Sequence, residues 1–115
     1  MTRKVTGMVI SVIAYQERRG WTAQCLEYDI AAQAKTFSDL RYEVDRVINS
    51  HIVVSEELGQ EPFAGIGPAP RKFWEMYEDA KLRVEREELP FRLPEPSRGI
   101  VITPRLKIAE QHATA

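Results

Sequence analysis

Few residues in this 115-residue sequence could do nucleophilic, acid–base or metal chemistry. It has one cysteine, Cys25, and two histidines, His51 and His112. No Cys-x-x-Cys or His-x-x-x-His spacing is present, so a zinc site is not expected. Cys25 alternates with Trp21 along an apolar stretch, which indicates a small buried residue rather than a reactive thiol. The sequence therefore predicts neither a bound metal nor a cofactor.

His51 is the strongest candidate for acid–base chemistry. It lies on the apolar side of a predicted helix, with Ser55 one turn further on. A packed core or interface histidine is the simpler interpretation, and a small-molecule-binding or enzymatic domain centred on His51 is one alternative. Gly65-Ile66-Gly67 lies among prolines, without the preceding strand and following basic helix start of a phosphate-binding loop. We therefore expect a protein that is not an enzyme.

The charges are nearly balanced in total but unevenly distributed along the chain. Sixteen basic and seventeen acidic residues give a net charge of −1, so no overall cationic field attracts nucleic acid or a membrane surface. Residues 37–59 hold five acidic and two basic side chains, a net charge of −3. Arg3, Lys4, Arg18 and Arg19 form a local basic group around the first predicted hairpin. A nucleic-acid-binding protein that uses this hairpin is the second alternative.

The length and the cysteine content of the chain indicate its domain organisation and its cellular compartment. A chain of 115 residues suits one compact domain, with residues 1–59 as its core and residues 60–115 packed onto it. The lone cysteine forms no internal disulfide, and residues 1–15 lack the pattern of a secretory leader. No stretch has the apolar length of a membrane helix. We expect a cytoplasmic protein that does not enter a membrane.

The apolar pattern of the first half predicts a hairpin, a short strand and a long helix. β-branched residues crowd positions 4–15, a polar turn follows at 17–20, and polar and apolar residues alternate over 21–26. A third strand is predicted over 30–35. The predicted helix then runs from 37 to about 58, with an apolar stripe on one side. The residues of this stripe are Phe37, Leu40, Val44, Val47, Ile48, Ser55 and Leu58.

Residues that cap or end helices divide the rest of the chain into elements. Thr36 is the predicted N-cap of the first helix, with Asp39 reaching back as in a capping box, and Gly59 ends that helix. After a loop, a second helix is predicted from Arg71 to about Glu88. Its narrow aromatic stripe, Phe73, Trp74 and Tyr77, is interpreted as packing.

A proline-containing connector then leads to a short final strand over residues 99–103. Pro104 is expected to end this strand or restrict it to a sheet edge. The predicted fold class is α+β in the order β-β-β-α-α-β. Its sheet is a three- to four-stranded antiparallel sheet with the long helix on one face.

The stretch WTAQCLEYDIAAQAKTFSDLRYEVDRVI, residues 21–48, resembles the HicB-like antitoxin family. The shared signature is an aromatic residue in the second strand, a Glu-x-Asp before the third strand and a threonine that opens the helix. Ala34-Lys35 and Arg41-Tyr42 depart from it. The matching residues are Trp21, Ala23, Cys25, Glu27, Asp29, Gln33, Thr36, Phe37, Asp39, Val44 and Ile48.

The resemblance implies a three-stranded sheet crossed by one helix, similar to half a ferredoxin-like or ribonuclease-H-like unit. It implies a type II toxin–antitoxin antitoxin, a protein-binding module that occludes a small ribonuclease toxin. Many such antitoxins carry a further DNA-binding module, but the nine residues after Leu106 are too few for one, and DNA binding is left open.

The partner that the resemblance implies is a small, basic, ribonuclease-like toxin protein. Acidic side chains are the natural complement of such a basic partner. We also expect a homo-oligomer, with a dimer as the favoured form, because open sheet edges and an overhanging helix need cover. The candidate partner-binding residues are Glu27, Asp29, Asp45, Glu56 and Glu57.

Overall fold

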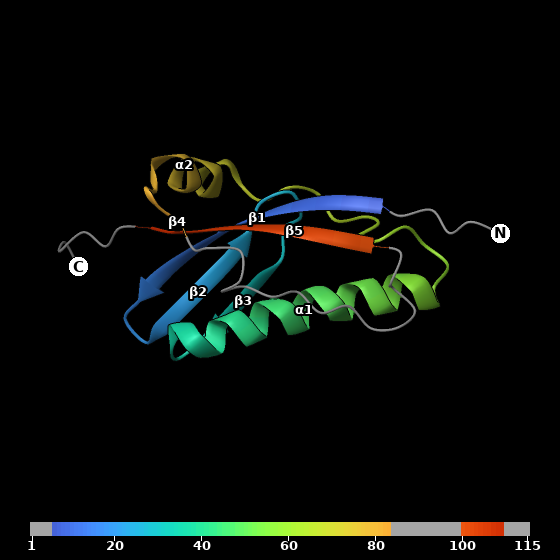
Figure 1. Cartoon of the computed structure of the whole chain (residues 1–115), viewed down its shortest axis with the longest axis horizontal. Helices are drawn as coiled ribbons and strands as arrows, with labels where there is room; N and C mark the ends of the chain where they lie inside the picture. The colour runs from blue at the N-terminus through green and yellow to red at the C-terminus, as the bar shows by residue number, and fades with distance from the viewer. Residues whose placement is uncertain (1–5, 84–99, 110–115) are drawn as a thin grey trace.

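The chain folds as three layers, with a five-stranded sheet between two helices (Figure 1). The structure, a computed structural model, describes residues 6–83 and 100–109. The α+β class predicted from the sequence is confirmed. The elements are β1 (Thr6–Glu17), β2 (Gly20–Cys25), β3 (Ala31–Ala34), α1 (Phe37–Glu57), α2 (Arg71–Asp79), β4 (Leu82–Arg83) and β5 (Ile100–Ile108).

The sheet has the strand order β3-β2-β1-β5-β4, with the long strand β1 at its centre. β1 pairs antiparallel with β2, and β2 pairs antiparallel with β3. β5 lies parallel to β1 from the pair Thr6 and Ile100 to the pair Ala14 and Ile108. The prediction of a three- to four-stranded antiparallel sheet is therefore wrong in strand number and in the direction of β5.

The final strand continues through Pro104 and does not end there. Ala109 donates its N–H to the carbonyl of Ala14, so the odd-numbered residues of β5 direct their N–H groups at β1. The even-numbered Pro104 therefore directs its ring nitrogen away from β1. β4 pairs only with Lys107 and Ile108, so no described strand needs a donor at Pro104.

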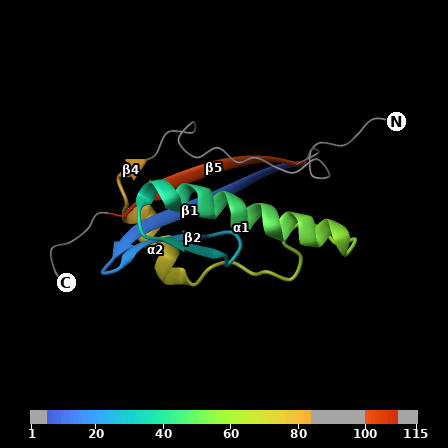
Figure 2. The same cartoon turned by 90° about the horizontal axis from the view of Figure 1, so that it is seen from below.

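Helix α1 covers one face of the sheet and lies closest to β3 and β2 (Figure 2). Its predicted cap is present, because the Thr36 hydroxyl accepts the N–H of Asp39 at 3.1 Å. The stripe differs from the prediction at two positions: Ile52, which was not included, is fully buried, and Leu58 is 64% exposed. Ser55 of α1 is also buried. The α1 residues of the apolar core are Leu40, Val44, Ile48 and Ile52, in one cluster with Ile10, Val12 and Ala14 of β1.

Helix α2 lies on the opposite face and is shorter than predicted. It ends at Asp79, because Ala80 turns to an extended backbone and is buried with Ile13 and Leu26. Residues 82–83 then join the sheet as β4, and residues 84–88 of the predicted helix lie outside the described part, as does the proline connector.

The aromatic side chains of α2 hold it to the sheet. The ring of Phe73 stacks on that of Tyr15 with centroids 6.2 Å apart. The indole N–H of Trp74 donates to the carbonyl of Ala69 at 3.2 Å. The Tyr77 hydroxyl donates to the carbonyl of Arg105 on β5 at 3.1 Å. Packing, as predicted, therefore accounts for this stripe.

Candidate functional site

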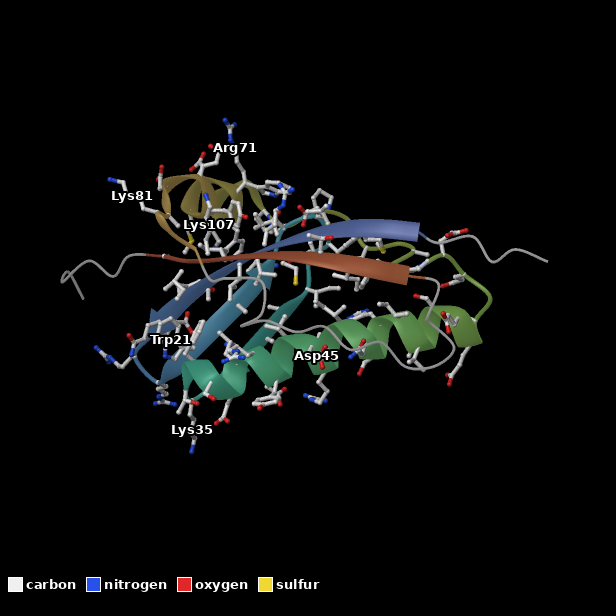
Figure 3. The ribbon with its side chains drawn as sticks, in the orientation of Figure 1. Trp21, Lys35, Asp45, Arg71, Lys81 and Lys107 are labelled. Atoms are coloured by element: carbon white, nitrogen blue, oxygen red, sulfur yellow. The ribbon has the colours of Figure 1, made fainter. Side chains whose placement is uncertain are left out.

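A cavity of about 710 Å³ opens where the β1–β2 turn meets the end of β3. The register of β2 and β3, with Trp21 opposite Ala34 and Thr22 opposite Gln33, brings these segments together. Trp21 and Lys35 lie at this same end of the molecule (Figure 3). We call this cavity the hairpin pocket; its lining residues are Glu17, Arg18, Arg19, Gly20, Trp21, Thr22, Gln33, Ala34 and Lys35.

Gly20 makes the hairpin pocket possible. Its φ of +152° is rarely adopted by residues with a side chain. A Cβ at this position would lie 2.5 Å from the carbonyl oxygen of Ala34 and 3.1 Å from the Cα of Lys35. The absence of a side chain therefore lets the turn that carries two arginines approach the end of β3 closely.

The hairpin pocket is locally cationic in a protein whose net charge is −1. Arg18, Arg19 and Lys35 are exposed, and none of them forms an ion pair with a described residue. The one acidic side chain of the pocket, Glu17, accepts a hydrogen bond from the Thr22 hydroxyl at 2.9 Å. Three cations and one carboxylate leave the lining with a net charge of +2.

Trp21 is the aromatic residue of the pocket lining. Its ring and that of Phe37, at the start of α1, pack edge to face, with centroids 5.2 Å apart and planes at 62°. Among the described residues, none accepts a hydrogen bond from the Trp21 indole N–H, whereas the indole of Trp74 is hydrogen-bonded. Trp21 thus joins β2 to α1 and retains a donor that no described residue uses.

The other end of α1 has the opposite character. Val54 and Leu58 are 52% and 64% exposed there, and Glu56 and Glu57 lie between them in the chain. The last turn contains no basic residue. The C-terminus of a helix carries a partial negative charge, and the two carboxylates add to it. We call these four residues, 54 and 56–58, the acidic end of α1.

Two of the predicted partner-binding carboxylates are engaged inside the fold. Both oxygens of Glu27 bind Ser11 on β1: one accepts its N–H at 2.7 Å and the other its hydroxyl at 2.8 Å. The carboxylate thus replaces a strand partner where β2 leaves β1. Asp29 accepts a hydrogen bond from the buried amide of Gln24 at 2.8 Å. These interactions give both residues a structural role at the bend before β3.

The predicted partner-binding residues do not form one surface. Asp45 lies near the middle of α1 and accepts a hydrogen bond from Asn49 at 3.2 Å (Figure 3). Glu56 lies eleven positions after Asp45 in the helix, which is about 16 Å along the axis. Glu56 and Glu57 both lie in the last turn of α1, where Glu57 is exposed near Val54 and Leu58 and Glu56 is half-buried on another side of the helix.

Two of the four residues of the predicted basic group lie in the described part of the structure. Arg18 and Arg19 line the hairpin pocket, whereas Arg3 and Lys4 lie outside the described residues. Sequence reasoning missed Lys35 as a member of this group, because only the pairing of β2 with β3 brings it to the hairpin. Trp21 was identified as a strand residue, but its position in the pocket depends on the same pairing.

Neither the Ser55 hydroxyl beside His51 nor the Cys25 thiol is arranged as an activated nucleophile. The Ser55 hydroxyl donates to the backbone carbonyl of His51 at 2.8 Å, and the imidazole lies beside Phe63 with ring centroids 6.3 Å apart. Burial raises the pKa of the Cys25 thiol to about 12, and the charge of Glu27 adds to this shift. A thiol that stays protonated at neutral pH is a poor nucleophile.

Comparisons with family models, with curated proteins and with solved structures find no match for this chain. Within residues 6–83 and 100–109, no helix combines the length and the apolar character needed to cross a membrane. The same residues contain no group of three histidine, cysteine or acidic side chains placed to hold a metal ion. The candidate sites are therefore the hairpin pocket and the acidic end of α1.

Proposed function

We propose that this chain is a protein-binding module that occludes a small, basic, RNA-cleaving protein, in the manner of a HicB-like antitoxin. The observation that carries the proposal is the acidic end of α1, where exposed aliphatic side chains adjoin unneutralised carboxylates. The family resemblance in residues 21–48 supplies the kind of partner.

The segment that carries the resemblance has structural roles that support the proposal. Trp21 packs on Phe37, Glu27 closes the end of the β1–β2 ladder, and Thr36 caps α1. These are the signature residues that shape three antiparallel strands and a helix across them. A module of this kind presents α1 as a rigid outer surface.

The acidic end of α1 suits a basic protein surface for two reasons. Val54 and Leu58 offer apolar area that a partner can cover, and surface apolar groups ringed by polar ones are typical of protein contacts. Glu56 and Glu57 stand at the negative end of the helix dipole, an unfavourable place for carboxylates. A cationic partner would relieve this repulsion and be steered by the local field.

The test is co-expression with the protein encoded by the neighbouring short reading frame, followed by affinity capture and size-exclusion chromatography. We expect a stable complex in which RNA cleavage by the partner is suppressed. Glu56→Lys/Glu57→Lys should slow association at least tenfold at low salt and flatten its salt dependence.

The matched control is Glu78→Lys/Asp79→Lys, which reverses two exposed carboxylates in the last turn of α2. This variant has the same net charge as the first one but an intact acidic end of α1. We expect it to associate within about threefold of the wild-type rate. The proposal is wrong if no complex forms, or if both variants slow association equally.

A further inference from the structure

We propose that the hairpin pocket binds a nucleotide, with the phosphate held by Arg18, Arg19 and Lys35 and the base against Trp21. This inference is independent of the proposed protein partner, because the hairpin pocket and the acidic end of α1 lie at opposite ends of α1 (Figure 1). It assigns a ligand to a concave feature with a cationic lining.

The charge of the hairpin pocket selects for an anion. Three exposed cations, Arg18 and Arg19 in the β1–β2 turn and Lys35 after the end of β3, are among its lining residues, and no described carboxylate pairs with any of them. Two of the cations are arginines, whose planar guanidinium groups match phosphate oxygens in bidentate pairs. The only lining carboxylate, Glu17, is held by the Thr22 hydroxyl.

Trp21 makes the hairpin pocket suitable for more than a bare phosphate. Bases stack on aromatic side chains whatever their sequence, and tryptophan has the largest ring system for this purpose. Phe37 meets the Trp21 ring at 62° and so steadies it. The indole N–H, which donates to no described residue, and the exposed amide of Gln33 add polar groups that a base or ribose can engage.

The volume of the hairpin pocket fits a ligand of this size. About 710 Å³ lies within the range of small-molecule sites, which is roughly 300–1,000 Å³. Its walls are fixed by backbone pairing of β2 with β3 and by the close approach of Gly20 to Ala34. The backbone that carries the lining side chains is therefore fixed before a ligand arrives, which lowers the cost of binding.

The experiment titrates the isotopically labelled full chain with adenosine monophosphate, with inorganic phosphate and with a ten-residue oligoadenylate. We expect amide shifts confined to residues 17–22 and 33–35. Oligoadenylate that binds at least tenfold more tightly than the mononucleotide identifies a nucleic acid strand as the source of the nucleotide. Equal affinities identify the free nucleotide.

Charge variants test whether nucleotide binding depends on the cations of the hairpin pocket or only on the net charge of the protein. Arg18→Gln/Arg19→Gln/Lys35→Gln should weaken nucleotide binding at least tenfold. Its matched control removes three exposed cations on and next to α2 and should bind within about threefold of wild type. That control is Arg71→Gln/Lys72→Gln/Lys81→Gln.

Trp21→Leu tests the aromatic wall. It should weaken adenosine monophosphate about tenfold and leave inorganic phosphate unchanged, a difference that a general loss of structure would not produce. The proposal is overturned if the wild-type chain binds neither nucleotide ligand at physiological salt. It is equally overturned if amide shifts fall outside the hairpin pocket, or if the control variant loses as much affinity as the pocket variant.

Discussion

The two ends of α1 differ in charge, in shape and in how they are built. The hairpin pocket is concave and cationic, and its lining comes from β1, β2, β3 and the turns between them. The acidic end of α1 projects two aliphatic and two acidic side chains from one helix turn. A net charge of −1 conceals this polarity, because the two regions nearly cancel. Local charge, read with local shape, is therefore the better guide to ligands in this protein.

Leu40→Asp should have the largest effect and remove both surfaces at once. Leu40 is 1% exposed between α1 and the sheet, so an unpaired carboxylate there costs on the order of 5 kcal/mol, comparable with the stability of a small domain. Circular dichroism should show an unfolded chain at 25 °C. Tyr42→Asp, at a 74% exposed position of the same helix, should melt within a few degrees of the wild type.

Gly20→Ala should damage the hairpin end and spare the acidic end of α1. The new Cβ meets the Ala34 carbonyl at 2.5 Å and the backbone has a positive φ, so we expect a loss of about 1–3 kcal/mol in the free energy of unfolding. Urea denaturation measures it. Gly7→Ala is the control, because its Cβ would meet nothing within 4 Å. Equal losses in the two variants would contradict the close approach.

The parts of the fold that depend on local sequence could be predicted. The hairpin follows from alternation around a polar turn, and the N-cap of α1 follows from Thr36. The parallel pairing of β5 with β1 could not be predicted, because it joins residues almost a hundred positions apart and leaves no periodic trace. The early end of α2 is also a tertiary effect, since Leu82 and Arg83 pair with β5 although their neighbours favour helix.

In the hairpin pocket, too, some residues could be predicted from local sequence and others depend on long-range pairing. Its arginines could be found as a local basic turn. Lys35 joins them only through the register that places Trp21 opposite Ala34, and no spacing in the sequence encodes that register. The acidic end of α1 was closer to prediction, because helix periodicity alone places Glu56 and Glu57 on its outer side. The exposure of Leu58 was missed, since its wheel position matches the buried stripe but lies beyond the core.

Alkaline pH should lower the free energy of unfolding, because Cys25 lies in the core between the two ends of α1. The folded Cys25 thiol has a pKa of about 12, raised by burial from an ordinary value of 9.0. Its contribution to stability is therefore complete below pH 9 and is lost as the pH rises toward 12, at about 1 kcal/mol per pH unit. Urea unfolding at pH 8.0 and 10.5 measures this loss in the free energy of unfolding.

Cys25→Ala is the control for this pH dependence. The alanine variant should be less stable at pH 8 but should lose less stability on going to high pH. Tyr15, whose pKa is also raised by burial, contributes equally in both proteins, so the difference isolates the thiol. Identical pH profiles for the two proteins would show that the thiol ionises as easily in the folded chain as in the unfolded one.

Glu56→Lys/Glu57→Lys should have the smallest effect on stability and the most informative sign. Lysines at the C-terminus of α1 interact favourably with the helix dipole. The free energy of unfolding, measured by thermal unfolding, should therefore rise by about a few tenths of a kcal/mol for each residue. Partner association should fall in the same variant. A loss of both stability and association would instead indicate damage to the helix.

We propose that a basic protein partner docks on the acidic end of α1 and leaves the hairpin pocket open. An amide spectrum of the isotopically labelled chain with the unlabelled basic protein from the neighbouring reading frame tests this docking. We expect shifts and broadening at residues 53–59, with residues 17–22 and 33–35 unchanged. Shifts that gather at the hairpin pocket and spare the end of α1 would show that the partner docks elsewhere.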